Sequence, residues 1–270
     1  MWNIAVFTAC IHPNGFTEEQ KKIREKQYED SLKFYIHNSD FDSIVFVDNS
    51  NSNLNYLKDM KKTNGFYTIN SKLIEYITYN WNKYTEKYNY WYSEAEIIDY
   101  AIDNSQLLDK LDDNKSFFKV TGRHIIKKIN SLIWMPQDER FFRWVYGFSC
   151  ISAVFKIKKK NYKDLLYKKV EDFYIKNQKQ NSINLEQVYY ILLREKFLYQ
   201  IDKTKWRRIF FHYLNDWSIR FWTPIKSQLI NKILYTWCYL LKLNQFGIFS
   251  KILDELFFKK WYQKKFWKNA

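Results

Sequence analysis

Polar and charged residues follow two apolar, β-branched segments of the sequence, a position where α/β proteins often hold chemistry. The segment 43–48 (SIVFVD) ends in Asp48 and continues into Asn49 and Ser50. A carboxylate at a strand end can accept hydrogen bonds from a ribose or a base, and the neighbouring Asn and Ser can do the same. The alternative is an ordinary turn, because these three residue types end strands routinely.

The segment 116–121 (SFFKVT) leads into Gly122 and Arg123. Lys119 and Thr121 share one face of the predicted strand, because side chains alternate along a strand. Glycine allows the backbone to pass close to a ligand. Lys119 and Arg123 can neutralise a diphosphate, and arginine can bind it through two hydrogen bonds. A surface strand followed by a simple glycine turn is the competing interpretation.

Three carboxylates are candidates for ligand or proton chemistry. Glu94 stands in the first turn of a predicted helix, where either ligand binding or the helix dipole accounts for it. Glu186, also in a first helical turn, and Asp138, in the loop MPQDERFF, can each act as the general base that takes a proton from an acceptor hydroxyl. A solvated or dipole-stabilised carboxylate is the alternative for both.

No metal or cofactor site is predicted. The three cysteines are far apart and form no CxxC pair, which fits a reducing compartment and gives no zinc spacing. The acidic pair Asp112 and Asp113 precedes a predicted strand instead of following one, so we interpret it as a solvated loop. P-loop, GxGxxG, nucleophile-elbow and HExxH patterns are absent from the sequence.

Apolar periodicity places these residues in an alternating order of strands and helices. We expect strands at 2–8, 43–48, 116–121, 148–157 and 197–201, and helices at 17–36, 53–61, 93–108, 162–174 and 184–195. Capping boxes begin the helices at Thr17, Ser93 and Asn184. The alternation predicts an α/β fold with a mainly parallel sheet flanked by helices. Ligands of such sheets bind at the carboxyl ends of strands, which singles out the loops after Thr8, Val47 and Val120.

Four segments in the same order resemble bacterial glycosyltransferases of capsule and lipopolysaccharide gene clusters. They are Gln27-Tyr28-x-x-Ser31-Leu32-x-Phe34, DFDSIVFVDNSN (40–51), SEAEIIDYAID (93–103) and FFKVTGRHIIKKIN (117–130). Those proteins typically show an IVFxENSG loop, a GEAxxIxxAI helix start and a KxTGRY or KxSGRY strand end. The resemblance covers about residues 4–200.

The resemblance implies a GT-A-like, Rossmann-like fold that binds a nucleotide sugar, with the KxTGR segment in the place of a metal-binding DxD. Lys119 and Arg123, instead of a divalent ion, then balance the leaving diphosphate. A glycan or lipid-linked acceptor is implied as the partner. Asp48, Ser93 and His124 depart from the family's usual Glu, Gly and Tyr. The predicted nucleotide-sugar-binding set comprises Thr8, Asp48, Asn49, Ser50, Glu94, Lys119, Thr121, Gly122 and Arg123.

The C-terminal part, residues 203–270, differs in composition from the predicted catalytic domain, residues 1–202. It holds 14 Lys and Arg against three acidic residues, and therefore carries most of the chain's net charge of +15. Apolar residues recur every fourth position over 225–241, as in an amphipathic helix. Basic and aromatic residues together favour an anionic membrane surface, so we expect a cytoplasmic protein held peripherally at the inner face of the cell membrane. A helical lid packed on the catalytic domain is the alternative, and the uncharged run 233–241 is about half of a bilayer crossing.

Two other functions compete with sugar transfer. Interleaved aromatic and basic residues also suit single-stranded nucleic acid, and a non-catalytic membrane scaffold on an enzyme-like fold has the same tail. Nucleic acid is not expected as a partner, because the first 202 residues are close to neutral and carry no RNP, KH or zinc-finger pattern.

Overall fold

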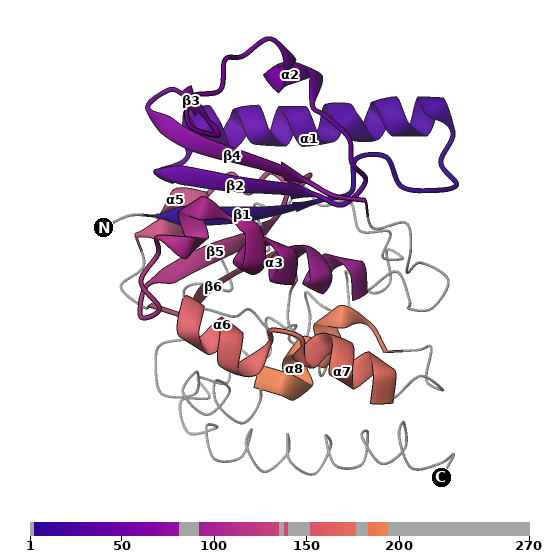
Figure 1. The fold of residues 1–270 in the computed structure, drawn as a ribbon, viewed down its shortest axis with the longest axis vertical. Helices are drawn as coiled ribbons and strands as arrows, with labels where there is room; N and C mark the ends of the chain where they lie inside the picture. Colours follow the sequence, from indigo (N-terminus) through magenta and orange to yellow (C-terminus); the bar gives the residue numbers. More distant parts are fainter. Residues whose placement is uncertain (1–2, 81–91, 135–137, 140–151, 177–182, 194–270) are drawn as a thin grey trace, which may run out of the picture. The chain divides into compact units, whose positions relative to one another are not determined.

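The computed structural model describes residues 3–80, 92–134, 138–139, 152–176 and 183–193 (Figure 1). By contacts between residues, the chain divides into two compact units, Met1–Glu195 and Lys196–Ala270. All described residues belong to the first unit. The predicted strand at 197–201, the boundary at residue 202 and the basic tail therefore lie outside the described residues.

A six-stranded sheet forms the centre of the described unit, in the order β3-β4-β2-β1-β5-β6. Its strands are β1 (Ile4–Ala9), β2 (Ser43–Asp48), β3 (Phe66–Ile69), β4 (Lys72–Thr78), β5 (Ser116–Thr121) and β6 (Val154–Lys158). The four central strands run parallel to one another, while β3 and β6 are antiparallel to their neighbours. The sheet is thus mixed, which corrects the expectation of a mainly parallel sheet.

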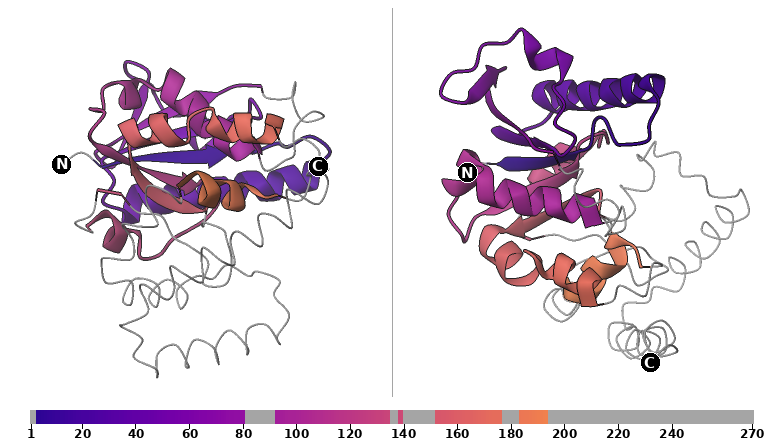
Figure 2. Two further views of the ribbon diagram at one scale, coloured as in Figure 1. Left: turned by 90° about the horizontal axis from the view of Figure 1, so that it is seen from below. Right: turned by 45° about the vertical axis from the view of Figure 1, so that its right-hand side comes forward.

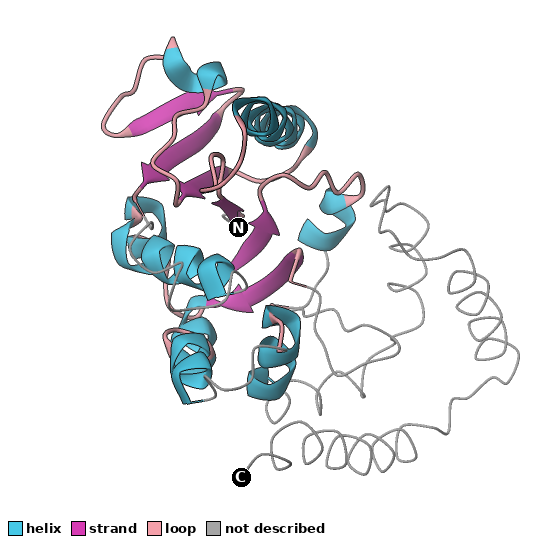
Figure 3. Cartoon of the chain, turned by 90° about the vertical axis from the view of Figure 1, so that its right-hand side faces the viewer, coloured by secondary structure: helices cyan, strands magenta, loops and turns pink. Residues whose placement is uncertain are grey.

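The helices of the described residues flank this sheet on both sides (Figures 1 and 3). They are α1 (Glu18–Asn38), α2 (Asn55–Lys58), α3 (Tyr92–Asn104), α4 (Gln106–Asp109), α5 (Ile129–Ile133), α6 (Lys159–Leu165), α7 (Lys169–Lys176) and α8 (Leu185–Leu193). Helices α1 and α3 lie on opposite faces of the central strands, as the two views of Figure 2 also show. Residues of one strand that alternate in sequence therefore face different helices.

Aromatic side chains fill the layer between α1 and the sheet. Phe7 of β1 packs edge-on against Tyr35 of α1, with ring centroids 4.8 Å apart. Phe46 of β2 packs in the same manner against Tyr28, at 6.1 Å. All four residues are buried, and such edge-to-face contacts add to the hydrophobic stabilisation of the layer. This packing accounts for part of the high aromatic content of the sequence.

The hairpin of β3 and β4 is the main element that the sequence analysis missed. Its turn is made by Asn70 and Ser71, which both adopt positive φ angles of 50° and 62°. Ile69 pairs directly with Lys72 across them, so the turn has the two-residue form that favours a hairpin. The segment FYTINSKLIEYIT, with its β-branched and aromatic residues on both sides of an Asn-Ser pair, carried a signal for it.

Two predicted helices are each divided in the structure. The predicted helix 93–108 is α3 and α4, because Ser105 begins a new helix by accepting a hydrogen bond from the backbone N–H of Leu108. Ser93 lies inside α3 and is not its N-cap, which corrects that capping box. The predicted helix 162–174 is α6 and α7, separated at Lys168, whose φ angle of 56° is incompatible with a continuous helix.

The other predicted elements agree more closely with the structure. The strands 43–48 and 116–121 have the predicted bounds, and the first strand runs from Ile4 to Ala9. The capping boxes at Thr17 and Asn184 are both formed. Residues 148–151 of the predicted fourth strand are outside the described residues, and β6 begins at Val154. Within the described ranges, no helix combines the length and apolar character needed to cross a membrane.

Asp99 joins α3 to the turn between α6 and α7. Its carboxylate accepts hydrogen bonds from the Tyr162 hydroxyl at 2.7 Å and from the backbone N–H of Lys168 at 3.1 Å. Burial is the largest influence on this carboxyl group and raises its pKa to about 7, although both hydrogen bonds oppose the shift. The folded protein therefore holds the proton of the Asp99 carboxyl group more tightly than the unfolded chain does.

We predict that this proton makes the stability of the protein depend on pH. The contribution of the protonated Asp99 carboxyl group to the free energy of unfolding is complete below about pH 4. It is lost as the pH rises to about 7, because the folded state must then hold a buried charge. The Asp99→Asn variant should lack this dependence, so it should gain stability relative to the wild type as the pH rises from about 5 to about 8. Urea unfolding at several pH values measures the difference, and a difference that is constant with pH would contradict the prediction.

Candidate functional site

The carboxyl ends of the central strands meet at one edge of the sheet and bring most of the predicted residues together. Thr8 of β1 is paired with Thr121 of β5, and Ala9 is paired with Asp48 of β2. Ligands of α/β sheets bind at this kind of edge. The three loops that the sequence singled out therefore do lie side by side.

A buried ion pair between Lys119 and Glu94 stands on the α3 side of this edge. The Nζ atom of Lys119, on β5, donates a hydrogen bond to Oε1 of Glu94, in the first turn of α3. The same oxygen accepts hydrogen bonds from the hydroxyl of Thr121 at 2.6 Å and from that of Thr8 at 3.3 Å. One carboxylate oxygen thus links α3, β5 and β1.

Lys119 is fully occupied by these contacts. Its side chain is 0% exposed, and its ammonium also donates to the Thr121 hydroxyl at 2.7 Å and to the carbonyl oxygen of Ser152. A lysine has three N–H donors, so none is left for a further partner in this arrangement. Burial lowers the pKa of Lys119, and the Glu94 carboxylate beside it opposes that shift.

The two carboxylate oxygens of Glu94 differ in their contacts. Its Oε2 accepts no hydrogen bond from the residues that the structure describes, and its side chain is 24% exposed. Burial by itself would raise the pKa of Glu94, but the Lys119 charge and the hydrogen bonds from Lys119 and Thr121 outweigh it and hold the pKa below its usual range. The group is therefore an ionised carboxylate, with one acceptor oxygen that no described residue occupies.

The loop after β2 is organised around Asp48. This carboxylate is 0% exposed and accepts hydrogen bonds from the backbone N–H groups of Ile11, Ser50 and Ser52, as well as from the Ser50 hydroxyl. Burial nevertheless raises the pKa of Asp48. Asn49 is also buried, and its Oδ1 has no hydrogen-bond partner within the described ranges. In this arrangement the Asp48 oxygens and the Ser50 hydroxyl hold the chain's own loops in place.

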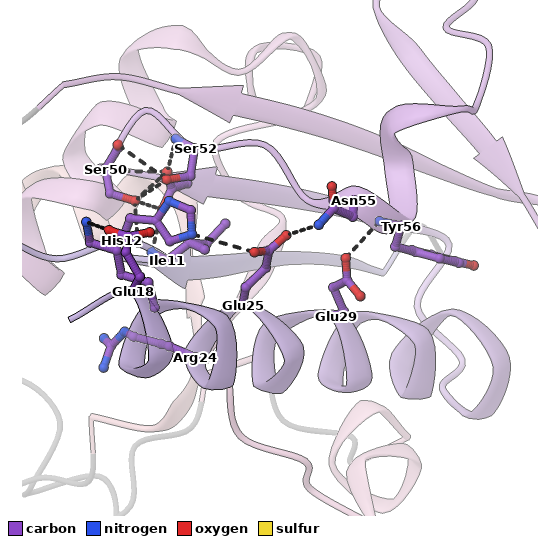
Figure 4. A network of polar contacts seen from close by, with 12 residues as sticks. Ile11, His12, Glu18, Arg24, Glu25, Glu29, Ser50, Ser52, Asn55 and Tyr56 are labelled. Atoms are coloured by element: carbon purple, nitrogen blue, oxygen red, sulfur yellow. Dashed lines mark hydrogen bonds and ion pairs between the residues drawn. The ribbon is translucent and has the colours of Figure 1, made fainter. Parts of the chain in front are cut away.

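Two carboxylates of α1 contact the segments that follow β1 and β2 (Figure 4). Glu25 lies 3.6 Å from the His12 imidazole and accepts a hydrogen bond from the Asn55 amide at 2.6 Å. Glu29, one turn further along, accepts from the backbone N–H of Tyr56 at 2.8 Å. These carboxylates fix the segments after β1 and β2 against one helix.

Gly122 is needed where β5 leaves the sheet. Its backbone N–H donates to the carbonyl oxygen of Thr8 at 2.9 Å. A Cβ atom at this position would lie 3.0 Å from that oxygen and 3.3 Å from the ring of Tyr28. The close approach of the Thr8 carbonyl and the Tyr28 ring explains the glycine, and Arg123 follows directly after this contact.

Arg123 is partly exposed and, unlike Lys119, has no partner within the part of the chain that the structure describes. Its guanidinium takes part in no ion pair or hydrogen bond with the described residues. Next to it, the pKa of His124 falls to about 4, mainly through burial and then through the charges of Arg123 and Lys119. His124 is therefore neutral at neutral pH, so Arg123 and not His124 carries the positive charge next to Gly122.

The two predicted general bases are in different places. Glu186, in the first turn of α8, accepts a hydrogen bond from the backbone N–H of Ser152 at 3.3 Å and lies close enough to Lys119 to affect its pKa. Asp138 forms an ion pair with Lys158 at 3.1 Å, and its carbonyl oxygen contacts Ser116. Ser116 begins β5, so the structure does not bring Asp138 to the edge that holds the other residues.

Sequence reasoning missed Arg24 of α1, whose Nε atom donates to the carbonyl oxygen of Cys10 at 2.6 Å. The capping box at Thr17 fixes the start of α1 and hence the turn on which Arg24 stands, but nothing in the sequence places that turn beside the loop after β1.

Among the described residues, no group of three or more His, Cys, Asp and Glu side chains is arranged to hold a metal ion.

No protein-family model and no curated protein matches this sequence. Among solved structures, the chain is similar to the glycosyltransferase GlyE of Streptococcus pneumoniae TIGR4, with a TM-score of 0.42 and 13% sequence identity. The similarity covers 73% of this chain and 44% of that chain.

We predict that Lys119 and Glu94 are strongly coupled. Lys119→Met should cost about 3 kcal/mol of stability, because a partly buried carboxylate then loses its counter-charge. The double variant with Glu94→Gln should recover about 1–3 kcal/mol of the summed losses. Urea unfolding of the four proteins measures the coupling.

Lys156, a buried lysine on β6 that lies over the Phe118 ring, is the matched control, and Lys156→Met should combine additively with Glu94→Gln. Equal coupling in both pairs would refute the prediction.

Proposed function

We propose that this protein is a glycosyltransferase that binds a nucleotide sugar at the carboxyl edge of β1, β2 and β5. The observation that carries the proposal is the arrangement of Glu94 and Arg123. Among the described residues, Oε2 of Glu94 accepts no hydrogen bond and the Arg123 guanidinium has no partner, and both residues stand at the carboxyl edge of the sheet, where ligands of α/β sheets bind. A nucleotide sugar needs both kinds of group, because it carries hydroxyl donors and a diphosphate.

In this proposal Lys119 and Arg123 have different tasks. Arg123 binds the diphosphate, since its fork-shaped guanidinium suits two phosphate oxygens at once. Lys119 contacts Glu94 and not the phosphates, because its three donors are used within the protein. This revises the expectation from the sequence that both cations face the diphosphate. Glu94 accepts a hydrogen bond from a hydroxyl of the donor through Oε2.

Sugar transfer then follows from these positions. The acceptor hydroxyl oxygen attacks C1 of the donor sugar, the bond from C1 to the diphosphate oxygen breaks, and its electron pair leaves with the diphosphate. Arg123 stabilises the charge that develops on this leaving group, which is the task of a divalent ion in enzymes with a DxD motif. We propose that the reaction is metal-independent on this basis.

Glu186 is the better candidate for the general base. It lies near Ser152 and Lys119, whereas Asp138 is held by Lys158 at the start of β5. A base must reach the acceptor hydroxyl within hydrogen-bond distance at the moment of transfer. The mechanism proposed here uses a general base and assigns no carboxylate as a nucleophile. We therefore propose direct displacement with inversion at C1.

The remaining parts of the proposal concern the cellular setting. The resemblance to capsule and lipopolysaccharide enzymes suggests a glycan or lipid-linked acceptor in the synthesis of a surface polysaccharide. The basic, aromatic residues 203–270 would hold the enzyme at the cytoplasmic face of the membrane, where donor and lipid-linked acceptor meet.

We predict that the full chain is stabilised by nucleoside diphosphates. A thermal-shift panel of UDP, GDP and TDP, with CMP as a nucleotide that carries no diphosphate, should identify one diphosphate that raises the Tm, because a ligand that binds only the folded state stabilises it. Arg123→Gln should weaken the affinity for that nucleotide about 10- to 100-fold, the range expected for charge-assisted hydrogen bonds of about 1.5–3 kcal/mol. Lys127→Gln, an exposed lysine on the same loop, is the control and should bind as the wild type. Unchanged binding by Arg123→Gln would remove Arg123 from the site.

We also predict that the tail binds anionic membranes. The full chain should sediment with liposomes that contain anionic lipid, and a variant with Gln at Lys259, Lys260, Lys264 and Lys265 should bind at least tenfold more weakly, since each basic residue contributes about 1 kcal/mol. The control replaces four exposed lysines of the described unit, Lys26, Lys61, Lys110 and Lys160. Equal losses in the two variants would show that net charge, and not the tail, is responsible.

A further inference from the structure

A second arginine stands beside the loop after β1, on the α1 side of the sheet edge. Arg24 projects from α1 on a different side of the helix from Glu25, which is directed at Asn55 (Figure 4). Its Nε atom donates to the carbonyl oxygen of Cys10 at 2.6 Å, and one terminal nitrogen lies 3.4 Å from the hydroxyl of Tyr28. That hydroxyl in turn accepts a hydrogen bond from the backbone N–H of Cys10 at 3.0 Å.

Tyr28 connects this arginine to Arg123. Its ring packs against Gly122, where an added Cβ would lie 3.3 Å from two ring carbons, so the chain leaves β5 directly over Tyr28. Arg123 follows in sequence. The charges of Arg24 and Arg123 both act to lower the pKa of the Cys10 thiol and of the Tyr28 phenol, against the larger effect of burial. This agrees with the contacts that bring Arg24 and the backbone of Gly122 to Tyr28.

The described part of the chain provides no acidic partner for either guanidinium. Within the described residues, Arg24 and Arg123 form no ion pair with any carboxylate. The nearby Asp48 carboxylate is occupied by donors of its own loops. Two like charges near one another repel, and the repulsion is relieved when an anion binds between them.

Arg24 is also held in a fixed orientation with donors to spare. Its guanidinium lies over the rings of Phe16 and Tyr28, 5.6 and 5.7 Å from their centroids. An arginine has five N–H donors, and the contacts with Cys10 and Tyr28 use two of them. A guanidinium fixed by stacking loses little freedom when it binds a ligand, which favours affinity.

We propose that Arg24 and Arg123 together form a pyrophosphate-binding clamp at the ends of β1 and β5. This inference rests on the proposed function, which it deepens by naming the second cation and by placing the diphosphate on the α1 side of the edge. Glu94 then meets the hydroxyl-bearing part of the donor on the α3 side. Each arginine holds phosphate oxygens through paired N–H groups.

The test is the binding of inorganic pyrophosphate and of nucleoside diphosphates to the full chain, by isothermal titration calorimetry at low ionic strength. The proteins are the wild type, Arg24→Gln, Arg123→Gln and the double variant, with Lys26→Gln, an exposed lysine on the same helix, as the matched control. We expect the wild type to bind pyrophosphate, each Gln variant to bind at least tenfold more weakly, and the double variant to show no measurable binding. Lys26→Gln should bind as the wild type.

Arg24→Lys separates a specific contact from a loss of folding, because it keeps the charge and the helix but lacks the paired donors. We expect it to fold and to bind pyrophosphate several-fold more weakly than the wild type. Wild-type affinity in Arg24→Lys together with Arg24→Gln would overturn the clamp. Equal weakening by Lys26→Gln and Arg24→Gln would also overturn it, since bulk charge would then explain the effect.

Failure of the clamp and failure of the proposed function give different results. If a nucleotide sugar binds and is used as a donor with equal efficiency by the wild type and Arg24→Gln, the clamp is wrong and the glycosyltransferase proposal stands. If pyrophosphate binding depends on both arginines but no nucleotide sugar binds, the clamp stands and the proposed function is wrong. A wild-type protein that binds no pyrophosphate overturns the clamp.

Discussion

The described unit depends most on the buried contact between Lys119 and Glu94. An ammonium with no exposure to water is costly unless it is paired and fully hydrogen-bonded, and Glu94, Thr121 and Ser152 meet that requirement. The contact fixes the first turn of α3 above the ends of β5 and β1. It also orients Glu94 so that Oε2 accepts no hydrogen bond from the described residues. The contact that stabilises the buried lysine therefore also positions the oxygen that we propose as a ligand acceptor.

The two faces of the sheet give the edge two different characters. Side chains that alternate along β5 and the loop after it send Lys119 and Thr121 towards α3, while Gly122 meets Tyr28 of α1. The α3 face therefore carries a carboxylate stabilised by a buried cation. On the α1 face, Arg24 has no acidic partner among the described residues, and we propose that Arg123 joins it there. A ligand with hydroxyl groups at one end and a diphosphate at the other matches that division.

The sequence predicts the elements better than it predicts the roles of their residues. Strand bounds follow from short apolar runs, and helix starts follow from capping boxes such as that of Thr17, because both signals are local. The edge location of Arg123 also follows from strand order, whereas that of Glu94 depends on β4, which the sequence analysis missed. Whether a charge is free or already paired depends on contacts across the fold. Lys119 and Arg123 therefore look alike in the motif, although one is buried in an ion pair and the other has no partner in the described part of the chain.

The most direct test of this account is a crystal structure of the full chain with the nucleoside diphosphate that stabilises it most. The account predicts phosphate oxygens within hydrogen-bond distance of the Arg123 guanidinium, while the Lys119 ammonium still contacts Glu94. A phosphate bound to the Lys119 ammonium, with Glu94 displaced from it, would contradict the division of roles. A nucleotide at the opposite edge of the sheet, near Asp138, would contradict the site itself.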